Sequence, residues 1–327
     1  MPARGPLDCL KEICRFENAR LPQKCSKYGP DSFALNSGAI RAFARICEHI
    51  LNLGDEVAFP STSYFSLSSL VEERYTPRPF EFRDFNFDFA SFKKVIAKST
   101  KLVWLCQPNN PTGLYISDSD FLKIIEYLNE RKIWLLLDES CDNFQMEAKS
   151  WIPPNITSQN VIRIKSFAKD LNLAGIRLGY TIADPALISA LNYMTPILDG
   201  NPPTIAIRAI TAHFHELFCG ADQNHNIQYE LNHKKIQESF NSLKVAIVKA
   251  DVAKEIVFPE ACYYLLVKLK SDKSSDQFFL DLINNTGNIV VPGTVFGYPI
   301  DECWVRICFA RETFSLEKLV LDIKSQL

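Results

Sequence analysis

The sequence predicts an α/β protein with a large, doubly wound, mostly parallel sheet and a smaller α+β region at its C-terminal end. Two observations predict the large sheet. Between about residues 30 and 200, short apolar runs alternate with helix-length amphipathic segments, as in βαβ units. Runs such as IWLLL at 133–137 are apolar at every position, as in strands that helices cover on both faces. A third observation predicts the smaller region: after Thr204 a helix-favouring stretch precedes a second group of strand-like runs.

The elements follow in chain order. The strands expected in the large sheet are 56–60, 101–105, 133–137 and 161–164. The segment 121–132 repeats apolar residues at helical spacing and ends in Arg131 and Lys132, which suits a helix C-terminus. After a helical stretch at 204–245, the expected elements are strands at 261–269, 288–293 and 304–310 and a helix at 316–327. We therefore divide the chain into an N-terminal helix and connection (1–29), a large domain (30–205), an interdomain helical region (206–245) and a small C-terminal domain (246–327).

The composition argues against several classes of protein. The 327 residues have a formal net charge of −2, so there is no basic footprint for a nucleic acid or an anionic membrane. No apolar run reaches the roughly 18 residues of a membrane span, and Asp8 and Glu12 interrupt the region where a signal peptide would be apolar. The ten cysteines include no CxxC pair, and no third ligand is suggested near His213 and His215. We expect free thiols, no metal site and a cytoplasmic protein.

Two motifs in the first half of the chain suggest a ligand site. Asn36, Ser37 and Gly38 precede a helical run, and N–H groups at such a helix start can bind a phosphate, although an ordinary helix cap is the alternative. The segment QPNNPTG at 107–113 directly follows an expected strand. It places the amide of Asn110 where open α/β sheets bind ligands, although a proline-rich turn would look the same.

Two further motifs follow later strands. Asp138 comes directly after IWLLL, where a carboxylate can pair with a protonated ring nitrogen of a cofactor; otherwise it is a helix cap or a solvated acid. The segment 166–180, SFAKDLNLAGIRLGY, brings Ser166, Lys169 and Arg177 within twelve residues. A hydroxyl and a guanidinium can hold a phosphate while the amine forms an imine, whereas a lone lysine would simply be solvated.

Together these residues resemble the class I and II aminotransferases, which depend on pyridoxal 5'-phosphate (PLP) and have PLP fold type I. The motifs occur in the family's order: S-G-A, N-N-P-T-G, D-E, S-x-x-K, G-x-R-x-G, and then VVPGTVFG and WVRICFA near the end. The branch of histidinol-phosphate aminotransferase and threonine-phosphate decarboxylase is the most similar. The resemblance runs from about residue 28 to the C-terminus. It implies PLP as cofactor, a small amino acid and a 2-oxo acid as substrates, and a homodimer.

The resemblance assigns a role to each matching residue. Lys169 would form the Schiff base with PLP and later move the proton between the substrate α-carbon and the cofactor. Asp138 would pair with the pyridine nitrogen, and Asn110 would hydrogen-bond the ring oxygen O3'. Tyr64 would stack on the ring, unless it is a packing residue at a strand end, and Arg306 would clamp the substrate α-carboxylate. The phosphate would be held by Gly38, Ala39, Ser166 and Arg177.

The sequence departs from the family at two places. Cys141 stands where the family usually has a tyrosine that donates to O3'. Only 37 residues precede Gly38, so the N-terminal arm that covers the substrate entrance in the family is expected to be missing or trimmed. Either change could alter the reaction.

Three functions remain open from the sequence. The main hypothesis is an aminotransferase that passes the amino group of a small L-amino acid to a 2-oxo acid. The second is a PLP enzyme of another reaction type, such as an amino-acid decarboxylase similar to threonine-phosphate decarboxylase, or a cyclase or oxidase of specialised metabolism. Cys141 and the short N-terminal segment favour it. The third is a module that holds PLP as a sensor without turnover.

Cys141 gives a first testable prediction. Without the tyrosine donor, the O3' oxygen is a better partner for the imine proton, so the pKa of the Schiff base should be higher than in ordinary aminotransferases. A pH titration of the cofactor absorbance measures this pKa, and an unusually low value would contradict the prediction.

Overall fold

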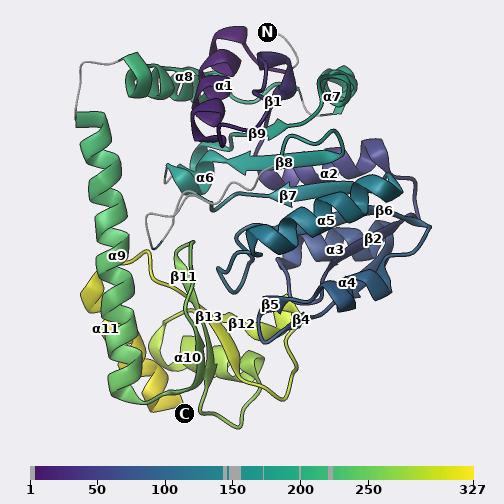
Figure 1. The fold of residues 1–327 in the computed structure, drawn as a ribbon. Helices are drawn as coiled ribbons and strands as arrows, with labels where there is room; N and C mark the ends of the chain where they lie inside the picture. Colours follow the sequence, from purple (N-terminus) through teal and green to yellow (C-terminus); the bar gives the residue numbers. More distant parts are fainter. Residues whose placement is uncertain (1–3, 143–145, 147–155, 172, 199, 220–223) are drawn as a thin grey trace.

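The computed structural model describes residues 4–142, 146, 156–171, 173–198, 200–219 and 224–327. These residues form two main sheets, a seven-stranded large sheet and a four-stranded small sheet (Figure 1). A two-stranded ribbon, β4 (Phe82–Arg83) and β5 (Asn86–Phe87), joins neither sheet. The turn of this ribbon reaches the small sheet, because the ring of Phe85 lies 5.7 Å from that of Trp304.

The large sheet is mixed but mainly parallel. Its spatial order is β1 (Phe33–Asn36), β9 (Gly179–Ile182), β8 (Val161–Ser166), β7 (Trp134–Asp138), β6 (Thr100–Cys106), β2 (Glu56–Pro60) and β3 (Thr76–Phe80). The neighbours from β8 to β3 pair in parallel, and β9 is antiparallel to both β8 and β1. All four predicted strands are present. The sequence did not reveal β1, β9 or β3, whose Pro77 and Pro79 suit an edge strand.

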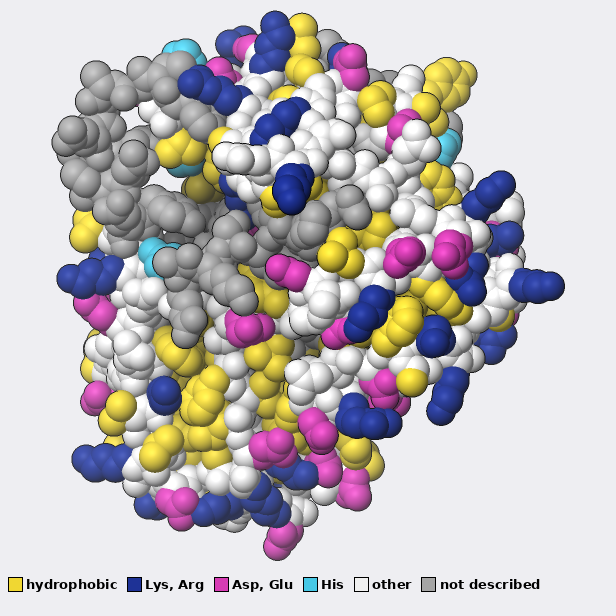
Figure 2. Space-filling model, in the orientation of Figure 1, with side chains coloured by type: hydrophobic (Ala, Val, Ile, Leu, Met, Phe, Trp, Pro, Cys, Tyr) yellow, Lys and Arg dark blue, Asp and Glu magenta, His cyan; other side chains and the backbone are white. Residues whose placement is uncertain are grey.

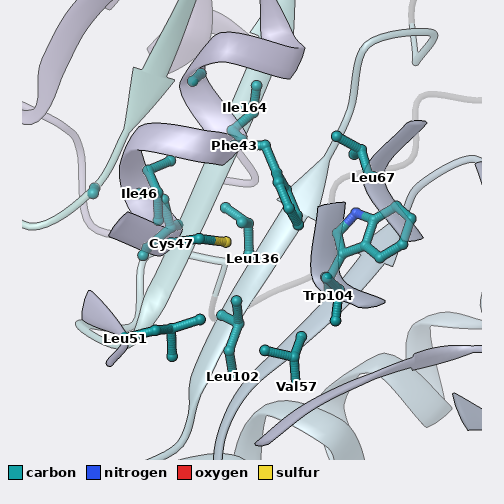
Figure 3. Close-up of a cluster of buried hydrophobic side chains, with 14 of the residues drawn as sticks. Phe43, Ile46, Cys47, Leu51, Val57, Leu67, Leu102, Trp104, Leu136 and Ile164 are labelled. Carbon is teal, nitrogen blue, oxygen red and sulfur yellow. The ribbon is translucent and has the colours of Figure 1, made fainter. Parts of the chain in front are cut away.

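Helices cover both faces of the large sheet. One face packs against α2 (Ala39–Ile50), α3 (Phe65–Arg74) and α7 (Pro185–Leu198), and the other against α4 (Phe89–Val95) and α5 (Asp118–Arg131). Successive residues of β6 point into different cores: Trp104 packs in the core on the α2 face, and Leu105 packs in the core on the α5 face. Figure 3 shows the first core, in which Phe43 and Cys47 of α2 converge on Trp104 and Leu136. The all-apolar runs therefore reflect burial on both faces, as predicted.

The small sheet is antiparallel. Its order is β10 (Ala253–Val257), β11 (Tyr264–Leu269), β13 (Trp304–Cys308) and β12 (Val291–Pro292). It packs with α9 (Asn224–Ala250), α10 (Ser275–Thr286) and α11 (Thr313–Gln326) in a separate core. Figure 1 shows α9 running along the side of the molecule down to the small sheet, beside α11. The helix that precedes α9 in the chain, α8 (Thr204–Cys219), packs against α1 (Leu7–Arg20).

The face of the molecule seen in Figure 2 carries charges of both signs. Figure 2 shows Lys and Arg side chains interspersed with Asp and Glu over the visible face. In the part of the chain that the structure describes, no helix is both long and apolar enough to cross a membrane.

A buried group of charges joins α1 to the ends of β7 and β8. Arg163 of β8 forms ion pairs with Glu17 of α1 at 3.1 Å and with Glu139 at 2.9 Å, and all three side chains are at most 2% exposed. The hydroxyl of Tyr180 donates to Glu17 at 2.7 Å. Burial opposes ionisation of Glu17, but the charges of Lys165 and Arg163 outweigh it and lower the pKa of Glu17 to about 2.

The same group fixes the chain that follows β7. Asp142 accepts hydrogen bonds from Lys165 and, at 3.0 Å, from Nη2 of Arg20. Together with the Glu139 pair, these bonds hold the residues on both sides of Ser140 and Cys141. Three acids and three bases make the cluster neutral, which a buried group of charges requires.

Removing one charge of this cluster should destabilise the fold. Glu17→Gln leaves Arg163 and Lys165 short of a counter-charge, and the expected loss is about 3 to 5 kcal/mol in the free energy of unfolding. Urea denaturation measures this free energy. The control is Lys123→Met, whose lysine is in an exposed ion pair with Asp120, and it should change the stability little. Equal effects of the two substitutions would contradict the prediction.

The stabilisation by Glu17 should also depend on pH. Because the folded pKa of Glu17 lies below its ordinary value of 4.5, its contribution to the free energy of unfolding is present above that value and is lost as the pH falls toward about 2.

Candidate active site

The parallel strands end at one edge of the large sheet. Because β1 is antiparallel to β9, and β9 to β8, the carboxyl end of β1 lies at the same edge as those of β2, β6, β7 and β8. Residues 36, 60, 106, 138 and 166 therefore end their strands at this edge. Open α/β sheets bind ligands at such an edge, and several of the predicted site residues lie just beyond these strand ends.

Asp138 is a buried acid at the end of β7, only 9% exposed. Its Oδ1 accepts hydrogen bonds from the backbone N–H of Ser140 at 3.0 Å and from the Ser140 hydroxyl. Its Oδ2 accepts from the thiol of Cys106 at 3.9 Å. Burial raises the pKa of Asp138, although the Ser140 bonds and the charge of Lys169 oppose the rise. A cationic partner would stabilise this carboxylate.

Gly38 and Arg177 form a cradle at the start of α2. Gly38 has φ +90°, a conformation that favours glycine. A Cβ built there would lie 2.7 Å from Nη2 of Arg177, so the guanidinium lies close against the backbone of Gly38. No side chain caps this helix start, whose first residue is Ala39. Backbone N–H groups beside a guanidinium suit an anion such as a phosphate.

Lys169 lies on the short helix α6 (Phe167–Asp170), directly after β8. Ser166, the last residue of β8, caps α6, because its Oγ accepts a hydrogen bond from the N–H of Ala168 at 3.3 Å. The charge of Lys169 acts on both Asp138 and Cys141. The amine therefore lies near the end of β7, close to the acid that the sequence predicts as its partner in cofactor binding.

Arg306 reaches the site from β13 of the small sheet. Its Nη1 donates to Oδ1 of Asn110 at 2.9 Å. Its guanidinium carbon lies 4.8 Å from the ring centroid of Tyr264 and 4.9 Å from that of Phe296. The Nε atom is buried without a hydrogen-bond partner. A buried donor of this kind requires an acceptor, and a carboxylate would satisfy it.

Cys141 meets a second thiol rather than standing alone. Its thiol is hydrogen-bonded to that of Cys262, a fully buried residue just before β11. This contact, with burial, raises the pKa of Cys141 well above its ordinary value. The next residue, Tyr263, places its ring centroid 5.3 Å from Nζ of Lys169. The assignment of Cys141 to the cofactor site stays a prediction.

The structure therefore brings most of the predicted residues to one edge. Gly38 follows β1, Asp138 ends β7, Lys169 lies on α6 after β8, Arg177 follows η2 (Ala174–Ile176), and the small sheet supplies Arg306. Tyr64 lies just before α3, after the end of β2, and its ring lies 5.1 Å from that of Phe65. Its stacking role stays a prediction.

Sequence reasoning missed the aromatic residues around Arg306 and Lys169. Tyr263, Tyr264 and Phe296 lie in segments that the sequence marked only as strands or as family motifs. The available signal was the pair of tyrosines at the point where a strand begins.

A groove of about 1060 Å³ lies elsewhere on the molecule. Its lining includes Leu114, Tyr115, Phe240, Phe258 and Glu260, and none of the predicted site residues. Among the described residues, no group of three or more His, Cys, Asp or Glu side chains could hold a metal ion.

The residues at the strand edge fit PLP. The cradle of Gly38 and Arg177 suits its phosphate, the buried carboxylate of Asp138 suits its protonated ring nitrogen, and Lys169 supplies the amine between them. This geometry, with the doubly wound sheet, defines a PLP-dependent enzyme of fold type I.

Comparison with known proteins shows the family. The family model of aminotransferase class I and II matches residues 4–322. The chain therefore belongs to the class I and II aminotransferases. Its cofactor is PLP, and the sequence-based predictions of fold, enzyme class and cofactor are confirmed.

Individual relatives agree with this assignment. The chain is 25% identical to histidinol-phosphate aminotransferase of Halalkalibacterium halodurans over 282 residues, which are 85% of this chain and 70% of that protein. It is 27% identical to aspartate aminotransferase of Sulfurisphaera tokodaii over 268 residues, 80% of this chain and 66% of that protein. A tetra mutant of Thermus thermophilus aspartate aminotransferase has a TM-score of 0.89 at 20% identity, covering 100% of this chain and 87% of its own.

The cradle can be tested with one methyl group. Gly38→Ala puts a Cβ against Nη2 of Arg177 and strains a residue at φ +90°, so PLP should bind at least about tenfold more weakly. Gly175→Ala, where a Cβ would meet nothing within 4 Å, is the control from the neighbouring loop. Fluorescence titration of the cofactor-free proteins with PLP gives both dissociation constants. Unchanged affinity in Gly38→Ala would show that the cradle does not hold the phosphate.

Proposed function

We propose that this aminotransferase moves the α-amino group of a small L-amino acid to a 2-oxo acid, with Lys169 as the catalytic residue. The observation that supports this most directly is the geometry of Arg306. Its Nε is a buried donor without a partner, and two aromatic rings flank its guanidinium. An α-carboxylate can accept from such a fork, which would fix the substrate relative to the amine of Lys169.

The proposed roles of the other residues follow from their positions. When bound, PLP supplies the electron sink for charge that develops at the substrate α-carbon. Asp138 would hold a cation in its buried site, and the Gly38 and Arg177 cradle would hold the phosphate. Lys169 would take the proton from the substrate α-carbon and deliver it to the cofactor on the far side of the amino nitrogen, so its amine would have to stay within reach of both positions. Asn110 would orient Arg306 through their hydrogen bond and so act as a positioning residue as well as a cofactor ligand.

A second candidate function is a PLP enzyme that does not transaminate, such as an amino-acid decarboxylase, a cyclase or an oxidase. Cys141 favours it, because the thiol is engaged with Cys262 and the usual phenol is absent from this position. The two functions share every residue of the strand edge and differ in which bond of the α-carbon is broken.

Organisation and assembly belong to the same proposal. We infer a large domain around the seven-stranded sheet (30–205), a small one around the four-stranded sheet (246–327) and a helical connection (206–245), because each sheet has its own core. A cytoplasmic homodimer is supported by the free state of the described cysteines and by apolar side chains on α7 and α8, where Tyr193 is 78% and Ile205 86% exposed. Light scattering would measure the mass, and a monomer would contradict the dimer.

Two variants test the proposed site. Borohydride reduction of the PLP-loaded protein should attach the cofactor to the peptide that contains Lys169, and Lys169→Ala should show no adduct. Arg306→Gln should lower kcat/KM for the preferred amino acid about 100-fold, because the substrate α-carboxylate loses its charged partner. Arg83→Gln, at a side chain that is 80% exposed, is the matched control.

The products decide between the two candidate functions. A panel of L-amino acids with a 2-oxo acid acceptor should yield the 2-oxo acid of the donor, identified by mass. Release of carbon dioxide or of a cyclised product without that 2-oxo acid would rule out transamination as the main reaction and support the second candidate.

A further inference from the structure

Ser140 is the second residue after β7, and it contacts the buried acid that ends this strand. Its backbone N–H donates to Oδ1 of Asp138 at 3.0 Å, and its hydroxyl donates to the same oxygen. Ser140 is partly exposed, whereas Asp138 is buried. One oxygen of the carboxylate is therefore held by two donors of a single residue.

These two bonds leave the other oxygen of Asp138 for a ligand. An ionised carboxylate has about four acceptor positions, two on each oxygen, and the donors of Ser140 fill those of Oδ1. Oδ2 accepts from the thiol of Cys106, a weak donor at 3.9 Å that ends the neighbouring strand β6. Among the bonds that the described residues make, one position on Oδ2 stays available to a stronger donor. The protonated ring nitrogen of PLP is such a donor.

The chain on both sides of Ser140 is fixed. Before it, the N–H of Glu139 donates to the carbonyl of Ile164 at 2.9 Å, and the carboxylate of Glu139 pairs with Arg163 of β8. After it, the N–H of Asp142 donates to the carbonyl of Glu139 at 3.4 Å and closes the turn. The backbone of Ser140 is therefore held next to Asp138, so the bond from its hydroxyl orders only one further torsion angle.

Asp138 needs these donors because it is buried. Burial raises the pKa of its carboxyl group, and the strongest opposing effect comes from the hydroxyl of Ser140, followed by the N–H of Ser140, the Cys106 thiol and the charge of Lys169. Loss of the hydroxyl would favour the protonated acid further. A neutral acid would stabilise a positive ring nitrogen less than a carboxylate does.

We propose that Ser140 is a positioning residue for the cofactor, which holds the carboxylate of Asp138 so that Oδ2 meets the protonated ring nitrogen of PLP. This inference rests on the proposed function, because it takes Asp138 as the partner of that nitrogen. Ser140 acts through Asp138, so its effect is confined to ligands that carry a ring nitrogen. A residue that merely supported the turn would affect every ligand of the site alike.

Two ligands that differ at one ring position test the proposal without turnover. In 1-deaza-PLP a C–H group replaces the ring nitrogen, while the phosphate and the aldehyde are unchanged. Fluorescence titration of the cofactor-free protein gives the dissociation constant of each ligand. Ser140→Ala should weaken the binding of PLP about tenfold and leave that of 1-deaza-PLP within about twofold, because only PLP depends on the carboxylate that the hydroxyl holds.

Three further variants make the measurement specific. Ser140→Thr keeps a hydroxyl and should restore most of the affinity for PLP. Ser140→Gly also removes the hydroxyl, and it gives the same comparison if Ser140→Ala does not fold. The matched control is Ser117→Ala at the start of α5, which removes a bond from a serine hydroxyl to Asp120 at 2.8 Å and should bind both ligands as the wild type does.

The outcomes separate this inference from the function on which it rests. Equal weakening of both ligands by Ser140→Ala, or unchanged binding of PLP, would overturn the role of Ser140. Asp138→Asn should weaken PLP far more than 1-deaza-PLP. If Asp138→Asn leaves the ratio of the two dissociation constants unchanged, Asp138 does not bind the ring nitrogen and the proposed function fails first. If Asp138→Asn changes this ratio and Ser140→Ala does not, only the role of Ser140 fails.

Discussion

The neutralisation of buried charge beneath the strand ends is the constraint on which the site depends. The strand β8 ends with two basic side chains, Arg163 and Lys165, in a position without solvent. Burying them is tolerable only because α1 and the chain after β7 bring carboxylates to them. The same ion pairs hold Glu139 and Asp142, and through them Asp138 and Cys141. The N-terminal helix is thus part of the support of the reaction centre, although it lies far from Lys169 in the sequence.

The second requirement is that the small sheet come close to the strand ends. A Cβ at Gly113 would lie 2.4 Å from Cβ of Pro259, so the backbone of the segment after β6 contacts the side chain of a segment that leads into the small sheet. A further contact joins the N–H of Ser63 to the carbonyl of Phe296 at 3.1 Å. These two contacts between the large sheet's strand ends and the small-sheet region bring Arg306 and Tyr263 close to Lys169. The residues proposed to bind the cofactor therefore come from the large sheet, whereas Arg306, the residue proposed to bind the substrate carboxylate, comes from the small one.

Much of this arrangement could be predicted from the sequence, because strands buried on both faces and turns at their carboxyl ends leave strong local patterns. The runs before Asp138 and Ser166 were of this kind, and both strands were predicted. The strand β3 left no such pattern, since TPRPF has alternating prolines and its pairing depends on a neighbour distant in sequence. The ion pair of Glu17 with Arg163 and the contact of Tyr263 with Lys169 could not be predicted. They join residues more than 90 positions apart, and only the packing of the two sheets and α1 brings them together.

Cys141 shows why a departure from a family pattern has to be interpreted in three dimensions. In the sequence it is a missing tyrosine, and the expected consequence is the loss of one hydrogen bond to the cofactor. In the structure its thiol contacts Cys262, which precedes Tyr263 in a left-handed conformation. The residue beside Lys169 is Tyr263, which comes just before β11 of the small sheet. The loss of a phenol beside Asp138 and the presence of one beside Lys169 are therefore connected through a single pair of thiols.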